Sequence, residues 1–235
     1  MQHKFTPRTR MFNLINDDAS LLSSVSRFGI SLGLGEKTVE EACKLNNIDC
    51  TTFLAVMNFL AEENVQPDDL VEKISIETVI GYLKNAHVYF LNYKLPIIRE
   101  KLNDAVSETE QLHSYKVVLL KFFDEYVDEV AKHIEYEDKT VFPYVINLLK
   151  GVRNPAYRIA DFEDHHTDVD SKIAELKNIL IKYHPTEEVN YRLNDVLLEL
   201  LWCERDLASH NMVEDFFFVP VVELIEHKLS NTALA

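Results

Sequence analysis

Apolar side chains recur every three to four residues along most of the chain, which is the spacing of one face of an α-helix. Four long stretches show the pattern, at about residues 72–104, 108–150, 155–183 and 187–229. Runs that alternate between polar and apolar residues, as a half-buried strand requires, are few, and the chain has only five glycines for turns. We therefore expect an all-α protein.

Helix-breaking residues lie between these stretches. We expect Gly151 to end the second, Asn154-Pro155 to begin the third as an N-cap followed by proline at the first helical position, and His184-Pro185-Thr186 to separate the last two. Connections this short make neighbouring helices antiparallel. The four helices should form an up-down-up-down bundle.

The chain before the bundle carries shorter helical patterns, at residues 17–28, 38–45 and 51–64, with a glycine-rich turn at 29–35. The segment Gln66-Pro67-Asp68-Asp69 has the composition of a linker, because Pro and Asp interrupt helices. We predict a small helical domain over residues 1–68 and the four-helix bundle over residues 69–235.

Composition excludes several classes of function. With 24 Lys and Arg against 39 Asp and Glu the formal charge is −15, and no basic run is present, so nucleic acid is not expected as a partner. The three cysteines form no CxxC pair, which argues against a disulfide framework or a thiolate zinc site and fits a reducing cytoplasm. No apolar run approaches the ~20 residues of a membrane span, and the N-terminus has no secretory apolar core.

Ionisable residues on the apolar faces carry the chemical information, since a buried charge without a partner is costly. On the second long stretch His133 and Glu137 fall near the centre of the apolar face, four residues apart and therefore adjacent. On the fourth stretch His210 and Glu214 repeat this arrangement. A proline follows each of these histidines by ten residues, which indicates a duplicated helical hairpin.

The first and third stretches supply the matching inward residues, His87 and His166. His87 precedes His133 by 46 residues, and His166 precedes His210 by 44. The neighbouring His165 lies off the axis of its apolar face, so we favour His166, although periodicity alone does not decide between the two.

Four histidines and two glutamates on facing helices suit two metal ions, each bound by two imidazoles, with both carboxylates bridging. Nitrogen and carboxylate ligands without thiolate favour non-haem iron; manganese stays open and zinc is less favoured. Single inward histidines are more often core residues than ligands, but six such residues in two matching sets are poorly explained by chance. The remaining histidines, His3, His113, His184 and His227, are expected at the surface.

Three further residues are candidates for the surroundings of the metals. Glu129 and Asp206 each lie four residues before a histidine and could accept a hydrogen bond from its free ring N–H. A solvated edge of the helix explains these two equally well. Tyr126 lies on the apolar face two turns from His133 and could line the pocket, although an ordinary core tyrosine is the simpler interpretation.

These residues resemble the hemerythrin-like (HHE cation-binding) family, and within it the di-iron proteins associated with repair of iron–sulfur clusters. That resemblance implies a ligand set of one His on the first and third helices and HxxxE on the second and fourth. Oxygen-carrying hemerythrins have an aspartate five residues after the last histidine, whereas Glu214 follows at four. Carried over, the implied ligands are His87, His133, Glu137, His166, His210 and Glu214.

The N-terminal segment, Phe28 to Gly35 followed by Lys37 to Cys43, is similar to the small extra domain of that branch. Gly33-Leu34 stands where the family pattern has two adjacent cysteines, so thiol chemistry cannot occur at those positions. Cys43, by itself, is interpreted as a packing residue. A smaller difference is that His87 lies nine residues before Pro96 rather than eight.

The resemblance implies one function, and two alternatives from other classes stay open beside it. The first is the repair of iron–sulfur clusters, or the donation of iron to them, under nitrosative or oxidative stress. A variant of it is an oxidoreductase reaction of nitric oxide, oxygen or peroxide at the di-iron centre. The expected partners are small diatomic molecules or peroxide, and damaged iron–sulfur proteins. The second is a sensor or carrier of oxygen or nitric oxide that signals through the N-terminal domain. The third, least favoured, is a structural bundle stapled by metal.

Overall fold

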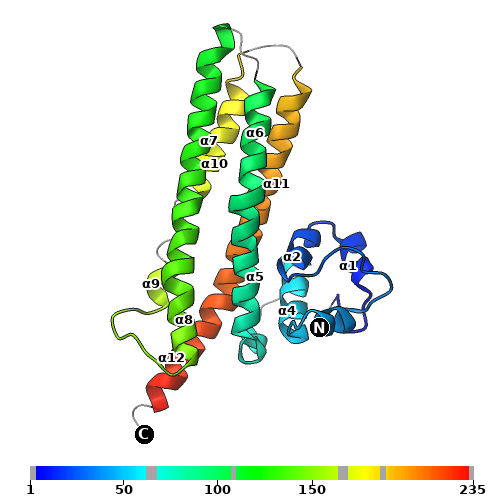
Figure 1. The fold of residues 1–235 in the computed structure, drawn as a ribbon, viewed down its shortest axis with the longest axis vertical. Coiled ribbons are helices and arrows are strands. Elements are labelled where there is room, and N and C mark those ends of the chain that lie inside the picture. The colour runs from blue at the N-terminus through cyan, green and yellow to red at the C-terminus, as the bar shows by residue number, and fades with distance from the viewer. Residues whose placement is uncertain (1–3, 62–67, 107–109, 164–168, 186–188, 233–235) are drawn as a thin grey trace. The chain divides into compact units, whose positions relative to one another are not determined.

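The computed structural model describes residues 4–61, 68–106, 110–163, 169–185 and 189–232 (Figure 1). Within these ranges all regular elements are helices and no strand is formed. The predicted all-α class is therefore confirmed.

The chain divides into two compact units. Unit 1 comprises Met1–Ala86, Phe142–Ala160 and Ser209–Ala235, and unit 2 comprises His87–Val141 and Asp161–Ala208. The domain boundary expected at residue 68 stays a prediction. Of its linker, residues 66 and 67 lie outside the described part of the chain, and Asp68 begins the 3₁₀ helix η1 (Asp68–Lys73).

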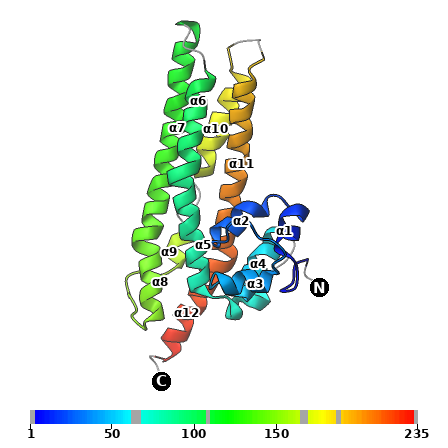
Figure 2. The same cartoon turned by 45° about the vertical axis from the view of Figure 1, so that its right-hand side comes forward.

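Unit 2 forms the predicted four-helix bundle. Its helices are α6 (Leu95–Ala105), α7 (Glu110–Tyr136), α10 (Val169–Lys182) and most of α11 (Tyr191–Val213), which lie side by side in Figures 1 and 2. Helix α7 packs against both α6 and α10. The core is made by the apolar faces read from the sequence, and its fully buried members include Leu119, Phe123, Val130, Ile173, Leu176 and Leu200.

Three of the four long stretches each consist of two α-helical parts joined by one π-helical turn. The first consists of α5 (Ile76–Tyr89), η2 (Phe90–Lys94) and α6; the second of α7, η3 (Glu137–Val141) and α8 (Phe142–Leu149); the fourth of α11, η4 (Glu214–Phe218) and α12 (Val219–Thr232). Each of η2, η3 and η4 is a single π-helical turn of five residues.

A proline explains each π-helical turn. Pro96, Pro143 and Pro220 each lie two residues after the end of such a turn. Proline has no N–H to donate, and its ring collides with the carbonyl four residues earlier in a regular α-helix. A wider π turn moves that carbonyl aside without ending the helix, and such turns are frequent at functional sites.

The third stretch begins later than expected. The first described helix after Gly151 is α9 (Ala160–Glu163), so the prediction that Asn154-Pro155 caps a helix is wrong. The side-chain oxygen of Asn154 instead accepts a hydrogen bond from the backbone N–H of Ala156 at 3.0 Å, which closes a local turn. Farther along, the N–H of Ile159 donates to Glu226 on α12 at 2.9 Å. These contacts hold residues 154–159 outside the helix.

The N-terminal part of unit 1 contains four short helices: α1 (Met11–Asp17), α2 (Leu21–Arg27), α3 (Val39–Leu45) and α4 (Cys50–Ala61). Residues 29–35 form the predicted turn between α2 and α3, and Gly33 adopts a φ of 86°, which favours glycine. Phe28 packs against Phe53 and Tyr82 with tilted rings, whose centroids lie 5.0 and 4.8 Å apart. This aromatic cluster joins the short helices to α5.

In the described part of the chain, none of the helices combines the length and apolar character needed to traverse a lipid bilayer.

Candidate metal centre

Within unit 2 two histidines approach opposite oxygens of one glutamate. Nε2 of His87 lies 2.9 Å from Oε2 of Glu137, and Nε2 of His133 lies 3.1 Å from Oε1. The Glu137 side chain has no exposed surface, and those of His87 and His133 are 3% and 12% exposed. One buried carboxylate therefore presents each of its oxygens to a different imidazole.

Helix geometry brings His133 and Glu137 together, whereas tertiary packing brings His87 to them. His133 is in the last turn of α7 and Glu137 is the first residue of η3, so they are neighbours on one helix face. His87 is near the end of α5, 50 residues earlier in the chain. Only the packing of two helices brings it to Glu137.

Within unit 1 the second His–Glu pair has the same geometry. Nε2 of His210 lies 3.1 Å from Oε1 of Glu214, and the two side chains are 1% and 0% exposed. His210 is in the last turn of α11 and Glu214 begins the π-helical turn η4. The duplication read from the sequence is thus also a duplication of local geometry.

The donor chemistry fits metal ions. A carboxylate only accepts hydrogen bonds, and a neutral imidazole has a single N–H and one lone pair. Both ring nitrogens of His87 face carboxylate oxygens, because Nδ1 lies 3.0 Å from Oδ1 of Asp138. A neutral ring can donate to only one of these carboxylates, which leaves its other nitrogen free to bind a metal ion. His87, Glu137, His210 and Glu214 all offer buried atoms of the type that bind metals.

The role of Asp138 was missed from the sequence. Asp138 belongs to η3 and directly follows Glu137, so consecutive residues contact the same imidazole from its two sides. A signal was present: the repeated motifs end in Glu137-Asp138 and Glu214-Asp215. Periodicity assigns the second residue of each pair to the outer face of the helix, because neighbours along a helix point in different directions.

The other candidate residues are placed less decisively. His165 and His166 lie outside the described residues, so the third-helix ligand stays a prediction. Glu129 accepts from Lys172 on α10 at 2.8 Å, and Asp206 is half-buried on α11. Tyr126 is fully buried beside Phe123, with ring centroids 6.3 Å apart, as a core residue would be. Roles for Glu129, Asp206 and Tyr126 near a metal stay predictions.

Two of the other histidines are exposed as expected, and one is not. His113 on α7 and His227 on α12 are exposed, and His3 lies outside the described residues. His184 is half-buried, with its ring 5.4 Å from that of Tyr115. His184 is therefore only partly exposed, because its ring lies against that of Tyr115.

The cysteines of the N-terminal helices are poorly suited to thiolate chemistry. Cys43 is buried, and burial together with the neighbouring Cys50 raises the pKa of its thiol well above the usual range. Burial also raises the pKa of the partly exposed Cys50. Both thiols are therefore neutral near pH 7, which agrees with the interpretation of Cys43 as a packing residue.

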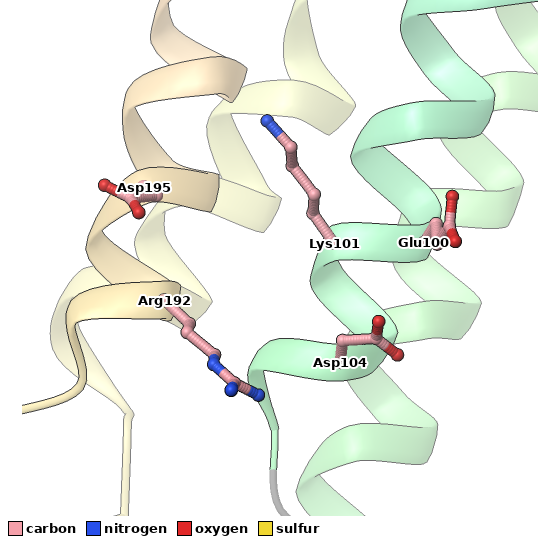
Figure 3. Close-up of a pocket in the computed structure, with 5 residues that line it drawn as sticks. All are labelled: Glu100, Lys101, Asp104, Arg192 and Asp195. Carbon is pink, nitrogen blue, oxygen red and sulfur yellow. The ribbon is translucent and has the colours of Figure 1, made fainter.

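A solvent-open pocket in unit 2 is separate from these residues. It is lined by Glu100, Lys101 and Asp104 of α6 and by Arg192 and Asp195 of α11 (Figure 3). All five side chains are exposed, and Asp104 lies 17 residues beyond His87, about 25 Å along the helix. The mixture of charges at this end of the bundle gives no sign of a metal site.

Comparison with known proteins adds independent information. The family model of the hemerythrin HHE cation binding domain matches residues 78–222. The iron-sulfur cluster repair protein ScdA of Staphylococcus haemolyticus is 21% identical over 192 residues, which cover 80% of this chain and 86% of that protein. The same-named protein of Staphylococcus epidermidis is 22% identical over 173 residues, covering 72% and 76%. No solved structure gives a significant match.

Proposed function

Because the chain belongs to the hemerythrin HHE cation-binding family, we propose that it is a non-haem di-iron protein that acts in the repair of iron–sulfur clusters damaged by nitrosative or oxidative stress. Two lines support this proposal. The buried His–Glu pairs have the donor chemistry of a metal centre, and relatives that align over most of the chain carry the name of iron-sulfur cluster repair proteins.

The observation that carries the proposal is Glu137 with an imidazole at each of its oxygens. Glu137 would therefore hold metal ions together with the two imidazoles. His87, His133 and Glu137 would be metal ligands, and His210, Glu214 and His166 would supply the repeated set that the resemblance implies. Imidazole and carboxylate ligands without thiolate favour iron over structural zinc.

Bound iron would supply a redox centre able to bind nitric oxide, oxygen or peroxide, or an exchangeable store of iron. The protein's own residues exclude water and position the donor atoms. Complete burial of Glu137 and Glu214 keeps water from the carboxylates and strengthens their attraction to a cation. The two His–Glu pairs, each set by one helical turn, hold donor atoms in place before a metal binds, which reduces the entropy lost on binding.

Iron donation can be tested with a purified enzyme whose iron–sulfur cluster has been damaged by nitric oxide. We expect the iron-loaded protein to restore its activity faster and further than an equal amount of free ferrous iron. The Glu137→Gln variant, which loses the buried negative charge beside the two imidazoles, should restore no more than free iron does. His113→Ala, at an exposed position of α7, is the matched control and should act like the wild type.

Equal restoration by wild-type protein, Glu137→Gln and free iron would contradict a role in iron donation. Steady consumption of nitric oxide or peroxide by the same preparation would instead assign the protein an oxidoreductase reaction at the centre.

A sensor of oxygen or nitric oxide is the second candidate, and one contact favours it. The amide of Asn85, two residues before His87 on α5, donates to the backbone carbonyl of Arg27 at 2.8 Å. The buried guanidinium of Arg27 also lies over the ring of Tyr82, 5.8 Å from its centroid. The N-terminal helices therefore hold the turn of α5 that leads to a candidate ligand.

Amide hydrogen exchange of the iron-loaded protein, with and without nitric oxide, separates this candidate from the first. A sensor should show altered protection in α2 without turnover of the gas. Unchanged protection in α2 would exclude signalling through this contact.

A further inference from the structure

We propose that Asp138 is the positioning residue of His87: its carboxylate accepts the Nδ1 proton and thereby commits Nε2 to the metal ion. This inference rests on the proposed function, since it concerns the same centre. It adds a residue that periodicity places on the outer face of the helix.

The contact is made from an unusual position. Oδ1 of Asp138 lies 3.0 Å from Nδ1 of His87, while the preceding residue, Glu137, approaches Nε2 at 2.9 Å. Both acidic residues belong to the π-helical turn η3. Because consecutive side chains leave a helix in different directions, they hold the ring between them.

The carboxylates around His87 determine which of its ring nitrogens carries the proton. An ionised carboxylate has no proton to give, so the contact with Asp138 is a hydrogen bond only when Nδ1 carries the hydrogen. A neutral ring protonated at Nδ1 has its lone pair on Nε2, the nitrogen that faces Glu137. Metal-ligating histidines commonly donate their second N–H to a carboxylate in this way, which fixes the tautomer and strengthens the ligand.

Partial exposure suits Asp138 to this role. Its side chain is 42% exposed, whereas that of His87 is 3% exposed. Water can therefore solvate the carboxylate, and the protein avoids the cost of burying a further charge next to Glu137. Glu129, the residue expected to support His133, is instead engaged by the ammonium of Lys172 at 2.8 Å.

The test compares metal binding by wild-type protein, Asp138→Asn and Asp138→Glu. Asn keeps the size of the side chain but removes its charge, and its amide group can donate to Nδ1 and favour the wrong tautomer. Metal-free protein is titrated anaerobically with Co²⁺, whose visible absorption reports imidazole and carboxylate ligation. We expect Asp138→Asn to weaken one of two binding events by about 10- to 100-fold and Asp138→Glu to recover part of the loss.

Asp128→Asn is the matched control, because it removes the same charge from an exposed position on α7. It should bind Co²⁺ as the wild type does. Asp138→Asn binding within twofold of the wild type, or an equal loss in Asp128→Asn, would overturn the proposal for Asp138 alone. A wild-type protein that binds no Co²⁺ or Fe²⁺ would overturn the proposed function as well.

A measurement without any variant covers the case in which Asp138→Asn fails to fold. In the diamagnetic zinc-loaded wild type, ¹⁵N shifts of the histidine rings report which nitrogen is protonated. We expect His87 to be protonated at Nδ1, with Nε2 bound to metal. Protonation at Nε2 would refute the role assigned to Asp138.

Discussion

Two buried glutamates determine the chemistry available to this protein at the scale of single residues. Glu137 and Glu214 have no exposed side-chain surface, and each lies 3.1 Å from the imidazole four residues before it. The effective cost of burying one ion in a protein is several kcal/mol. Such residues are tolerated when a cation balances them, so we expect the glutamates to be needed for metal binding more than for folding.

Replacing either glutamate by glutamine should therefore empty the centre and spare the fold. We expect Glu137→Gln and Glu214→Gln each to lower the iron content from about two to below one per chain. Without metal, their urea-unfolding midpoints should equal or exceed that of the wild type, because a neutral amide is easier to bury. Elemental analysis and urea unfolding provide the measurements. If both variants retained two irons, the ligand assignment would be wrong; His113→Ala serves as the control.

The raised pKa of the Cys43 thiol predicts a dependence of stability on pH. Burial keeps this thiol neutral in the folded protein, whereas in the unfolded chain it ionises near pH 8.5. Its contribution is fully present below that pH and is lost as the pH rises above it, by about 1.4 kcal/mol per pH unit.

Urea unfolding under reducing conditions, at several values between pH 7.5 and pH 10, measures this effect. Cys43→Ala should lose stability at pH 7.5 but show a shallower decline above pH 8.5 than the wild type. Groups that titrate in both proteins cancel in the comparison. Parallel pH profiles would show that Cys43 does not contribute.

At the scale of elements, the π-helical turns matter most. Turns η3 and η4 begin at the two glutamates, and each ends two residues before a proline. A proline in a regular helix costs about 3 kcal/mol, and a π turn accommodates it while the helix continues. Glu137 and Asp138, which contact one imidazole, both lie in η3. Each candidate ligand pair thus lies at a local departure from regular helix.

The connection between α8 and α9 depends on a hydrogen-bonded carboxylate. Glu226 on α12 accepts from the hydroxyl of Tyr144 on α8 at 2.5 Å and from the N–H of Ile159 at 2.9 Å. We expect Tyr144→Phe to destabilise the protein by about 1.5–3 kcal/mol, because one donor to a charged group is lost. Thermal or urea unfolding measures the change. Tyr191→Phe, at an exposed position of α11, should have almost no effect; equal losses in both variants would contradict this interpretation.

At the scale of the whole molecule, metal binding should be coupled to stability. A ligand that binds only the folded state and is present at 1,000 times its dissociation constant stabilises that state by about 4 kcal/mol. For a chain of this size we expect removal of iron by a chelator to lower Tm by about 8–16 °C. Scanning calorimetry before and after chelation tests this. The Glu137→Gln/Glu214→Gln double variant should show no shift, and an equal shift in that variant would place the stabilising metal elsewhere.

The sequence by itself determined the features that depend on short separations along the chain. The all-α class, the apolar faces of the bundle and the contacts His133–Glu137 and His210–Glu214 follow from helical periodicity, because residues four apart share a face whatever surrounds them. The prolines marked the sites of the π turns, although periodicity at 100° per residue did not reveal them.

Only the tertiary structure decided the contacts between distant segments. His87 meets Glu137 and Asp138 across about 50 residues of sequence, and Glu129 pairs with Lys172. The folded chain also decided a local conformation, because Asn154 forms a turn instead of the helix cap that its sequence predicted. These outcomes depend on which side chains packing brings together and on the backbone conformation that packing imposes. A carboxylate that is equally compatible with solvent, a lysine or a histidine takes the partner that the folded chain places within its reach.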